Sequence, residues 1–267
     1  MSKQSRRQKI NYRVQGDGQP VILIHGVSAS ERIWSSLTPD LVNAGYRVYA
    51  LDLLGHGDSF KPEDPKYYHV REIYNALEEW IDSLNLVELP ALVGHSLGGH
   101  LSLQYSLDHP ESVLRMVLID PYYSPAQLFS VARWMQSQAA IGAAAMQRTS
   151  GPWFDQLVIW NPILSKKLAI HHRRQMAYDI RRASPMILHI LPTVPDLTPQ
   201  LVNIPTPTLV IWGSLDRTLR ASTFNKLVDL LPNASAHKIV GTGHQPHLTT
   251  PEIVNSSILD FLMDWQT

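Results

Sequence analysis

The sequence predicts an α/β protein with a mostly parallel central sheet, flanked by helices and interrupted by a helical insertion. Two observations carry this prediction. Short apolar runs typical of buried strands alternate with helix-like segments over residues 1–121 and again over residues 205–267. Residues 122–204 lose this alternation and have the pattern of helices broken by prolines. We therefore expect a core of residues 1–121 and 205–267, covered by a helical cap of residues 122–204.

The predicted strands are the most regular signal in the sequence. The stretch Lys9–Gln15 alternates weakly between polar and apolar residues and ends in a glycine-rich turn. Residues 21–24 form an all-apolar run, as expected for a strand buried on both faces. Five further strands are expected at residues 47–51, 89–93, 114–119, 208–212 and 236–240. Strands that alternate with helices pair in parallel through right-handed crossovers.

Helices are expected between these strands. The clearest follows Tyr68, where apolar residues recur every three or four positions up to Leu84 and form one face. The segment 28–45 has Ser30 as its cap, and Pro39 either interrupts this helix or marks a new start. The other expected helices cover residues 101–109, 127–147, 165–182, 221–231 and 252–265.

Composition excludes several classes of function. The 267 residues include 23 Lys and Arg against 23 Asp and Glu, so no net charge favours nucleic acid or an anionic membrane surface as a partner. The chain has no cysteine, which excludes disulfides, thiolate metal sites and a cysteine nucleophile. The polar N-terminus lacks a signal-peptide pattern and no apolar run approaches 18 residues, so we expect a cytoplasmic protein without a membrane span.

The pentapeptide Gly94-His95-Ser96-Leu97-Gly98 lies between a predicted strand and a predicted helix. In that context a G-x-S-x-G pattern indicates a nucleophile elbow, in which glycines on either side let a serine stand exposed on a tight turn. The backbone N–H of Leu97 would open the helix and point outward, free to bind an oxyanion. The alternative is a glycine-rich turn of a doubly wound fold without catalytic function.

An activated serine needs a histidine base and a carboxylate that orients the histidine. Asp216 follows the strand 208–212, and His244 follows the strand 236–240. Groups at the carboxyl ends of parallel strands converge in one crevice, so we expect both to meet Ser96 there. Asp120, which ends the strand 114–119, is the competing carboxylate. The alternatives are a helix N-cap or turn residue for Asp216 and a surface-loop residue for His244.

A second oxyanion donor is expected in the segment His25-Gly26-Val27, which follows an early strand. We assign the donor to the N–H of Val27, with Gly26 allowing a close approach. His25 is expected to shape this loop by hydrogen bonding and not to act as a second base. No spacing of histidines and carboxylates indicates a metal site, and the other histidines of interest are treated as structural or solvated: His56, His95, His100, His171, His172 and His247.

The chain resembles the α/β-hydrolase superfamily over nearly its whole length. The residues that carry the resemblance are His25-Gly26, the loop Asp52–Ser59, the elbow 94–98, Asp216 and His244. The resemblance implies an eight-stranded sheet, of which seven strands are recognised here, and a cap at the position of the insertion. It also implies hydrolysis through an acyl-enzyme without metal or cofactor. A serine at position 96 argues against the epoxide-hydrolase and haloalkane-dehalogenase branches, and the loop after His25 lacks the proline and aromatic residue associated with cofactor-free haloperoxidases.

The leading hypothesis is an esterase that acts on a small to medium apolar carboxylic ester. The same residues suit cleavage of a C–C bond, a thioester or a lactone, and a non-catalytic ligand-binding protein is the alternative from another class. Two pairs of arginines, at 173–174 and 181–182, suit either the binding of a substrate carboxylate or a solvated helix face. Apolar cap residues that suit either the substrate cavity or the cap interior are Phe129, Trp134, Met135, Met146, Trp153, Phe154, Met176 and Met186.

Overall fold

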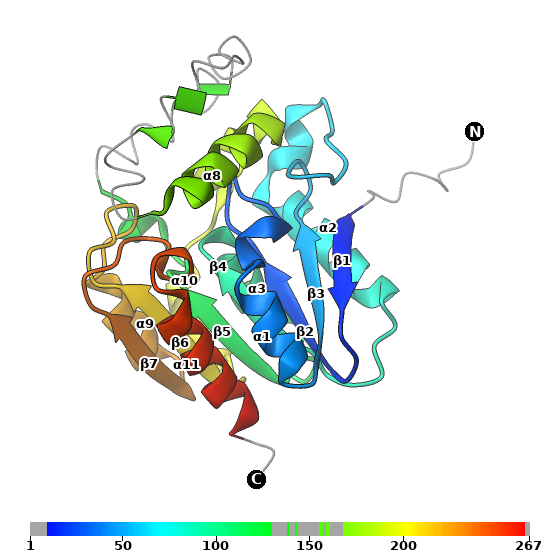
Figure 1. Cartoon of the computed structure of the whole chain (residues 1–267), viewed down its shortest axis with the longest axis vertical. Coiled ribbons are helices and arrows are strands. Elements are labelled where there is room, and N and C mark those ends of the chain that lie inside the picture. Colours follow the sequence, from blue (N-terminus) through cyan, green and yellow to red (C-terminus); the bar gives the residue numbers. More distant parts are fainter. Residues whose placement is uncertain are drawn as a thin grey trace.

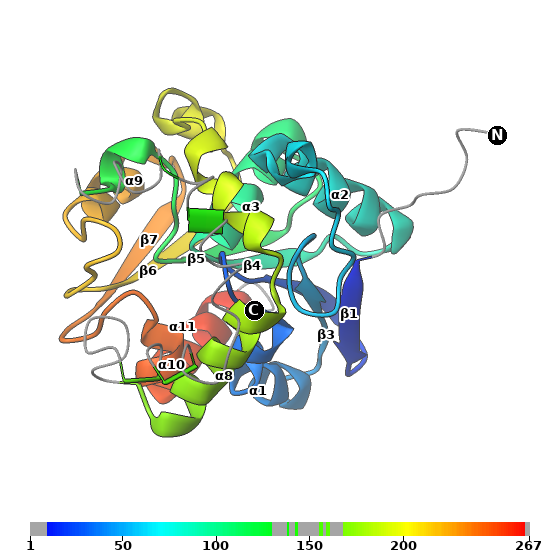
Figure 2. The same cartoon turned by 90° about the horizontal axis from the view of Figure 1, so that it is seen from above.

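The computed structural model describes residues 10–129 and 168–264, together with residues 138, 142–143, 155–156 and 159–160. In this part of the chain one sheet lies between two layers of helices, with α1 and α11 on one face and α2, α3 and α9 on the other (Figures 1 and 2). No helix among the described residues is long and apolar enough to cross a membrane.

The sheet contains seven strands in the order β1-β3-β2-β4-β5-β6-β7. Neighbouring strands are parallel, except that β1 runs antiparallel to β3. Each predicted strand is confirmed, and the weakly alternating stretch near the N-terminus is the edge strand β1. The strands are β1 (Asn11–Gln15), β2 (Gln19–Ile24), β3 (Tyr46–Asp52), β4 (Ala91–His95), β5 (Arg115–Ile119), β6 (Thr208–Gly213) and β7 (Ala234–Ile239).

The helices agree with the predicted pattern in most places. They are α1 (Leu37–Asn43), α2 (Val70–Ser83), α3 (Leu97–Asp108), α8 (Ile170–Arg182), α9 (Thr223–Leu230), α10 (Pro246–Thr249) and α11 (Pro251–Met263). The expected helix 28–45 is wrong as a single element, because a 3₁₀ turn, Glu31–Trp34, precedes α1. Ser30 caps that turn as expected, but Pro39 lies in the first turn of α1, where no backbone donor is needed.

The α3 helix begins at Leu97, directly after Ser96, as the nucleophile elbow requires, four residues before the helical pattern predicted from residue 101. The short α10 helix, which directly follows His244 and Gln245, was not predicted. The two glycines at the start of α3 hide its beginning from a propensity argument, since glycine disfavours helix interiors.

The insertion is only partly described, and the expected helix 127–147 lies almost wholly outside the described residues. The α8 helix crosses above the carboxyl ends of the strands (Figures 1 and 2). Short 3₁₀ turns follow it between Pro185 and Asn203. Their buried side chains, including Ile187, Leu197 and Leu201, belong to the same apolar core as α2 and α3. The last twenty residues of the insertion therefore pack as part of the main core.

Candidate active site

Ser96 occupies a sharp turn between β4 and α3. Its backbone has φ 53° and ψ −111°, a conformation that strains any residue with a side chain. Two backbone hydrogen bonds hold the turn: the N–H of Ser96 donates to the carbonyl of Ile119 at 3.0 Å, and its carbonyl accepts from the N–H of Tyr122 at 3.0 Å. Ser96 is partly exposed between buried neighbours and lines a large cavity.

The glycines on either side are required by close backbone contacts. A Cβ atom at Gly98 would lie 2.0 Å from the carbonyl oxygen of Ile24, and one at Gly94 would lie 2.5 Å from that of Gly98. Neither contact is compatible with a side chain. The pattern of glycines seen in the sequence thus has a steric cause in the packing of α3 against β2 and β4.

Asp216 and His244 meet at the end of β6 and β7. The Nδ1–H of His244 donates to Oδ2 of Asp216 at 2.7 Å, which leaves Nε2 free to accept a proton. The other oxygen of Asp216 accepts from the N–H groups of Thr218 and Leu219. Burial alone would raise the pKa of Asp216, but the adjacent His244 ring and these hydrogen bonds hold it below its usual value. Asp216 is therefore an anion that fixes the orientation of His244.

Ser96 and His244 line the same cavity. No hydrogen bond joins Ser96 Oγ to His244 Nε2 in the described part of the chain. Such bonds are often long in a free enzyme and shorten when substrate binds.

Asp120 is brought to the same place as Asp216. Side-chain atoms of Asp120, Asp216 and His244 all lie within 4.8 Å of one another. Asp120 is completely buried; its Oδ1 accepts from the N–H of Gly213 at 3.0 Å, and its Oδ2 has no partner among the described residues. Burial, and then the negative charge of Asp216, raise the pKa of Asp120 well above its usual value. We take Asp120 as a neutral acid, which together with the existing His244–Asp216 hydrogen bond makes these three groups a poor site for a cation.

The backbone N–H groups of Val27 and Leu97, the two expected oxyanion donors, have no hydrogen-bond partner in the described part of the chain. Leu97 is the first residue of α3. The Val27 loop is close to the serine, because a Cβ atom at Gly26 would lie 3.0 Å from Cβ of Ser96. A larger residue at position 26 would push this loop away from the elbow.

His25 is bonded on both sides of its buried ring. Its Nε2 accepts from the N–H of Leu53 at 2.9 Å, so the proton resides on Nδ1, which donates to the carbonyl of Gly26 at 2.7 Å. Burial lowers the pKa of His25. With both nitrogens engaged, His25 ties the Val27 loop to the loop after β3 and has no atom free to act as a base.

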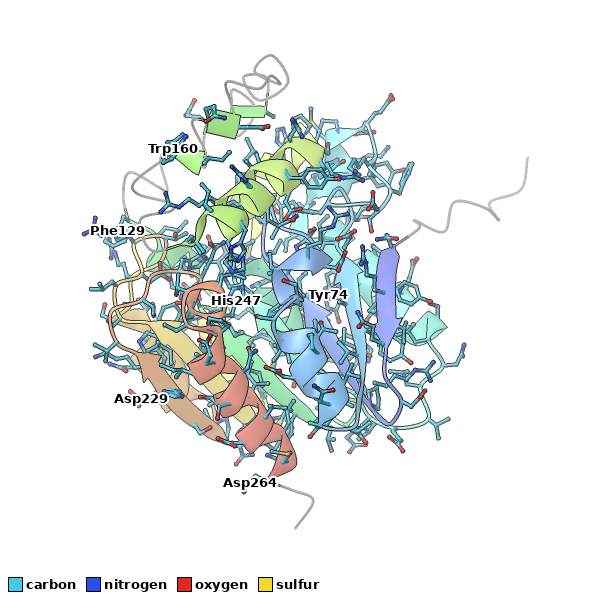
Figure 3. The ribbon with its side chains drawn as sticks, viewed as in Figure 1. Tyr74, Phe129, Trp160, Asp229, His247 and Asp264 are labelled. Atoms are coloured by element: carbon cyan, nitrogen blue, oxygen red, sulfur yellow. The ribbon has the colours of Figure 1, made fainter. Side chains whose placement is uncertain are left out.

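His95 makes a link that sequence reasoning missed. Its ring is buried next to Ser96, and its Nε2–H donates to the backbone carbonyl of His244 at 2.9 Å. The ring also packs on His247 of α10, which lies in the interior below α8 in Figure 3. The bond spans 149 residues, so no local pattern signals it. It holds the His244 loop against the elbow.

The cavity above these groups has a volume of about 1480 Å³, enough for a medium-sized ligand. Its apolar lining includes Val27, Tyr122, Leu128, Met176, Leu191 and Leu219. Of the cap residues considered from the sequence, Met176 lines the cavity, Met186 packs on the main core, and Phe129 is 43% exposed at the outer edge of the molecule (Figure 3). The others lie outside the described residues: Trp134, Met135, Met146, Trp153 and Phe154.

Three of the four paired arginines form ion pairs or hydrogen bonds with other groups of the protein. Arg182 forms an ion pair with Asp58, and Arg181 forms one with Asp155 at 2.9 Å. Arg173 donates to the carbonyl of Leu168 at 2.8 Å. These contacts favour a role in attaching α8 over a role in binding a substrate carboxylate.

Comparison with known proteins places the chain among hydrolases. The family profile described as the alpha/beta hydrolase fold matches residues 19–152, half of the chain. The chain is 25% identical over 282 residues to the human (lyso)-N-acylphosphatidylethanolamine lipase, covering 91% of this chain and 79% of that protein. It is 29% identical over 258 residues to the 2-hydroxy-6-oxo-6-(2'-aminophenyl)hexa-2,4-dienoic acid hydrolase of Metapseudomonas resinovorans. This alignment covers 92% of this chain and 85% of that protein.

Solved structures show the same fold. A thermophilic esterase from Thermogutta terrifontis superposes with a TM-score of 0.81 at 20% identity, covering 97% of this chain and 94% of that one. At this identity the similarity extends to the fold alone.

Proposed function

Because the chain belongs to the α/β-hydrolase fold family, we propose that it is a serine hydrolase that cleaves a carboxylic ester of a small to medium apolar substrate. The observation that carries the proposal is the 2.7 Å hydrogen bond from His244 to Asp216 at the rim of the cavity that Ser96 lines. The mostly apolar lining supports an apolar substrate.

In the proposed reaction, Nε2 of His244 accepts the proton of Ser96 while Oγ attacks the ester carbonyl. The carboxylate of Asp216 stabilises the resulting imidazolium. The N–H groups of Val27 and Leu97 donate to the oxyanion of the tetrahedral intermediate. His244 then protonates the leaving alcohol and activates the water that hydrolyses the acyl-enzyme.

The relative from Metapseudomonas resinovorans supports hydrolysis of a C–C bond as a second candidate, since 92% of this chain aligns with it. Both candidates use the same residues and differ in the substrate.

The test is turnover of p-nitrophenyl esters with acyl chains of increasing length by the purified protein and by Ser96→Ala. We expect the substitution to reduce turnover by a factor on the order of 10⁵ to 10⁶, by analogy with serine proteases. The matched control is Ser36→Ala, which removes another hydroxyl group from the lining of the same cavity and should retain activity. Full activity in Ser96→Ala would contradict the proposal, and cleavage of diketones but not of esters would favour the second candidate.

A further inference from the structure

Asp179 is a buried acid that the proposed mechanism does not use. It lies on α8, is only 2% exposed, and lines the cavity. Its Oδ1 accepts from the hydroxyl of Ser30 at 2.9 Å and from the amide of Gln175 at 2.8 Å. Its Oδ2 has no hydrogen-bond partner in the described part of the chain. A buried carboxylate oxygen without a donor is unusual, because buried polar groups are nearly always paired.

The neighbouring charges do not satisfy this oxygen. The guanidinium of Arg32 lies 5.0 Å from the centre of the Tyr178 ring and within 4.0 Å of carboxylate oxygens of Glu31 and Asp58, not of Asp179. Burial raises the pKa of Asp179 to about 6. At neutral pH the side chain is therefore mostly an anion, and one of its oxygens lacks the donor that would offset its loss of hydration.

Asp179 lies in the wall of the cavity that Ser96 and His244 also line. Ser30, which bonds the same carboxylate, comes three residues after Val27, the proposed oxyanion donor. The residues between them, Ser28 and Ala29, line the cavity, as do Met176 and Ile180 on α8. The wall around Asp179 thus contains apolar side chains and, at Oδ2 of Asp179, a carboxylate oxygen without a hydrogen-bond partner among the described residues.

We propose that Oδ2 of Asp179 binds a hydrogen-bond donor of the substrate, either an ammonium or a hydroxyl group. This inference rests on the proposed esterase function and narrows its substrate class. The preferred ester carries one such donor on an otherwise apolar body. The acceptor is supplied by the cap and the reacting groups by the core, so Asp179 determines specificity without taking part in the bond cleavage.

The test uses p-nitrophenyl esters of benzoic, phenylacetic and 3-phenylpropanoic acids, each substituted at position 3 or 4 of the ring. Every acid is made with an ethyl, a hydroxymethyl or an aminomethyl group. These three groups have similar size, and the panel varies the distance of the donor from the scissile carbonyl. Values of kcat/KM are compared within each set of three for the wild type, Asp179→Asn and the control Ser30→Ala.

We expect at least one set in which the wild type prefers the aminomethyl and hydroxymethyl esters over the ethyl ester by about tenfold or more. In Asp179→Asn the preference for aminomethyl should disappear, because the amide offers an N–H where the carboxylate offered an acceptor. The hydroxymethyl preference should persist in part, since a hydroxyl also accepts. Ser30→Ala removes one hydrogen bond to Oδ1 of Asp179 but leaves Oδ2 in place, so this variant should keep both preferences.

Wild-type protein that cleaves the ethyl esters but shows no preference in any set would overturn the inference, whether or not the variants fold. The same holds if Asp179→Asn retains the full aminomethyl preference. Failure of the proposed function itself has a different signature, in which the wild type cleaves none of the esters.

Discussion

The carboxyl groups of Asp120 and Asp216 lie side by side at the ends of β5 and β6, but only that of Asp216 bonds His244. They also differ in charge. Hydrogen bonds from His244, Thr218 and Leu219 keep Asp216 ionised, while burial beside that charge raises the pKa of Asp120 well above its usual value. One carboxylate is therefore suited to stabilise an imidazolium, whereas the surroundings of Asp120 favour its protonated form.

Replacing each of the two acids by its amide tests which of them must carry a negative charge. We expect Asp216→Asn to lower kcat by up to about 10⁴, because an amide favours the wrong imidazole tautomer. Asp120→Asn should lose much less, since an amide resembles the neutral acid in shape and charge. Steady-state kinetics on protein with an unchanged circular dichroism spectrum make the comparison. An inactive Asp120→Asn together with an active Asp216→Asn would reverse the assignment.

Much of this arrangement could be predicted from the sequence, because it depends on strand ends. The strands around Val93 and Ile211 are short apolar runs, and a mixed segment that ends near Ile239 precedes His244; in a parallel sheet the carboxyl ends of such strands meet. The glycines at 94 and 98 indicated the turn between β4 and α3. The relation of Asp120 to Asp216 could not be predicted, since the order of strands β5 and β6 in the sheet is set by long-range packing.

The strained backbone of Ser96 makes a prediction about stability. At φ 53° glycine is comfortable and alanine is not, so Ser96→Gly should be more stable than Ser96→Ala by about 1 kcal/mol. Ser256, exposed within α11, is the control, and there the alanine variant should be the more stable one. Urea unfolding measures both pairs. Equal stabilities of the two Ser96 variants would show that the turn stores no strain.

The raised pKa of Asp179 predicts a specific pH dependence of stability. Its pKa is about 6 in the folded protein against an ordinary value of 3.8, so the folded state binds the proton more tightly. Its contribution to stability is present below pH 4 and is lost as pH rises through 6, by roughly 3 kcal/mol. Asp179→Asn removes this loss.

The measurement is urea unfolding of the wild type and Asp179→Asn at pH 4 and pH 7.5. The variant should gain stability relative to the wild type between the two values. Asp229→Asn, which changes an exposed carboxylate on α9, should follow the wild type (Figure 3). If the free energies of unfolding of wild type and Asp179→Asn differed by the same amount at both pH values, a buried Asp179 with one unpaired carboxylate oxygen would be contradicted.

The two parts of the insertion should respond differently to truncation of a side chain. Leu201 is completely buried in the main core, so Leu201→Ala should reduce the free energy of unfolding by about 2–5 kcal/mol. Met176 is half-buried at the cavity, so Met176→Ala should reduce it by about 1 kcal/mol or less and change the preferred acyl chain length. We propose a cap that ends before residue 185 in place of one that ends at residue 204. A larger loss of stability in Met176→Ala than in Leu201→Ala would contradict this boundary.

The details of the cavity wall lay beyond sequence analysis for a physical reason. Asp179 contacts Ser30 and His95 contacts His244, in both cases across 149 residues. A buried acid on a helix with many polar residues, such as Ile170–Arg182, has the same sequence pattern as a solvated one. Only packing against the Val27 loop distinguishes them.

The proposed reaction requires Ser96 to be an activated nucleophile. This is measured by labelling of the native protein with a fluorophosphonate, followed by peptide mapping of the modified residue. We expect a single phosphonylated serine at position 96, with labelling abolished in Ser96→Ala and strongly slowed in Asp216→Asn. Absence of labelling in folded wild-type protein, or labelling at another serine, would contradict the proposed reaction.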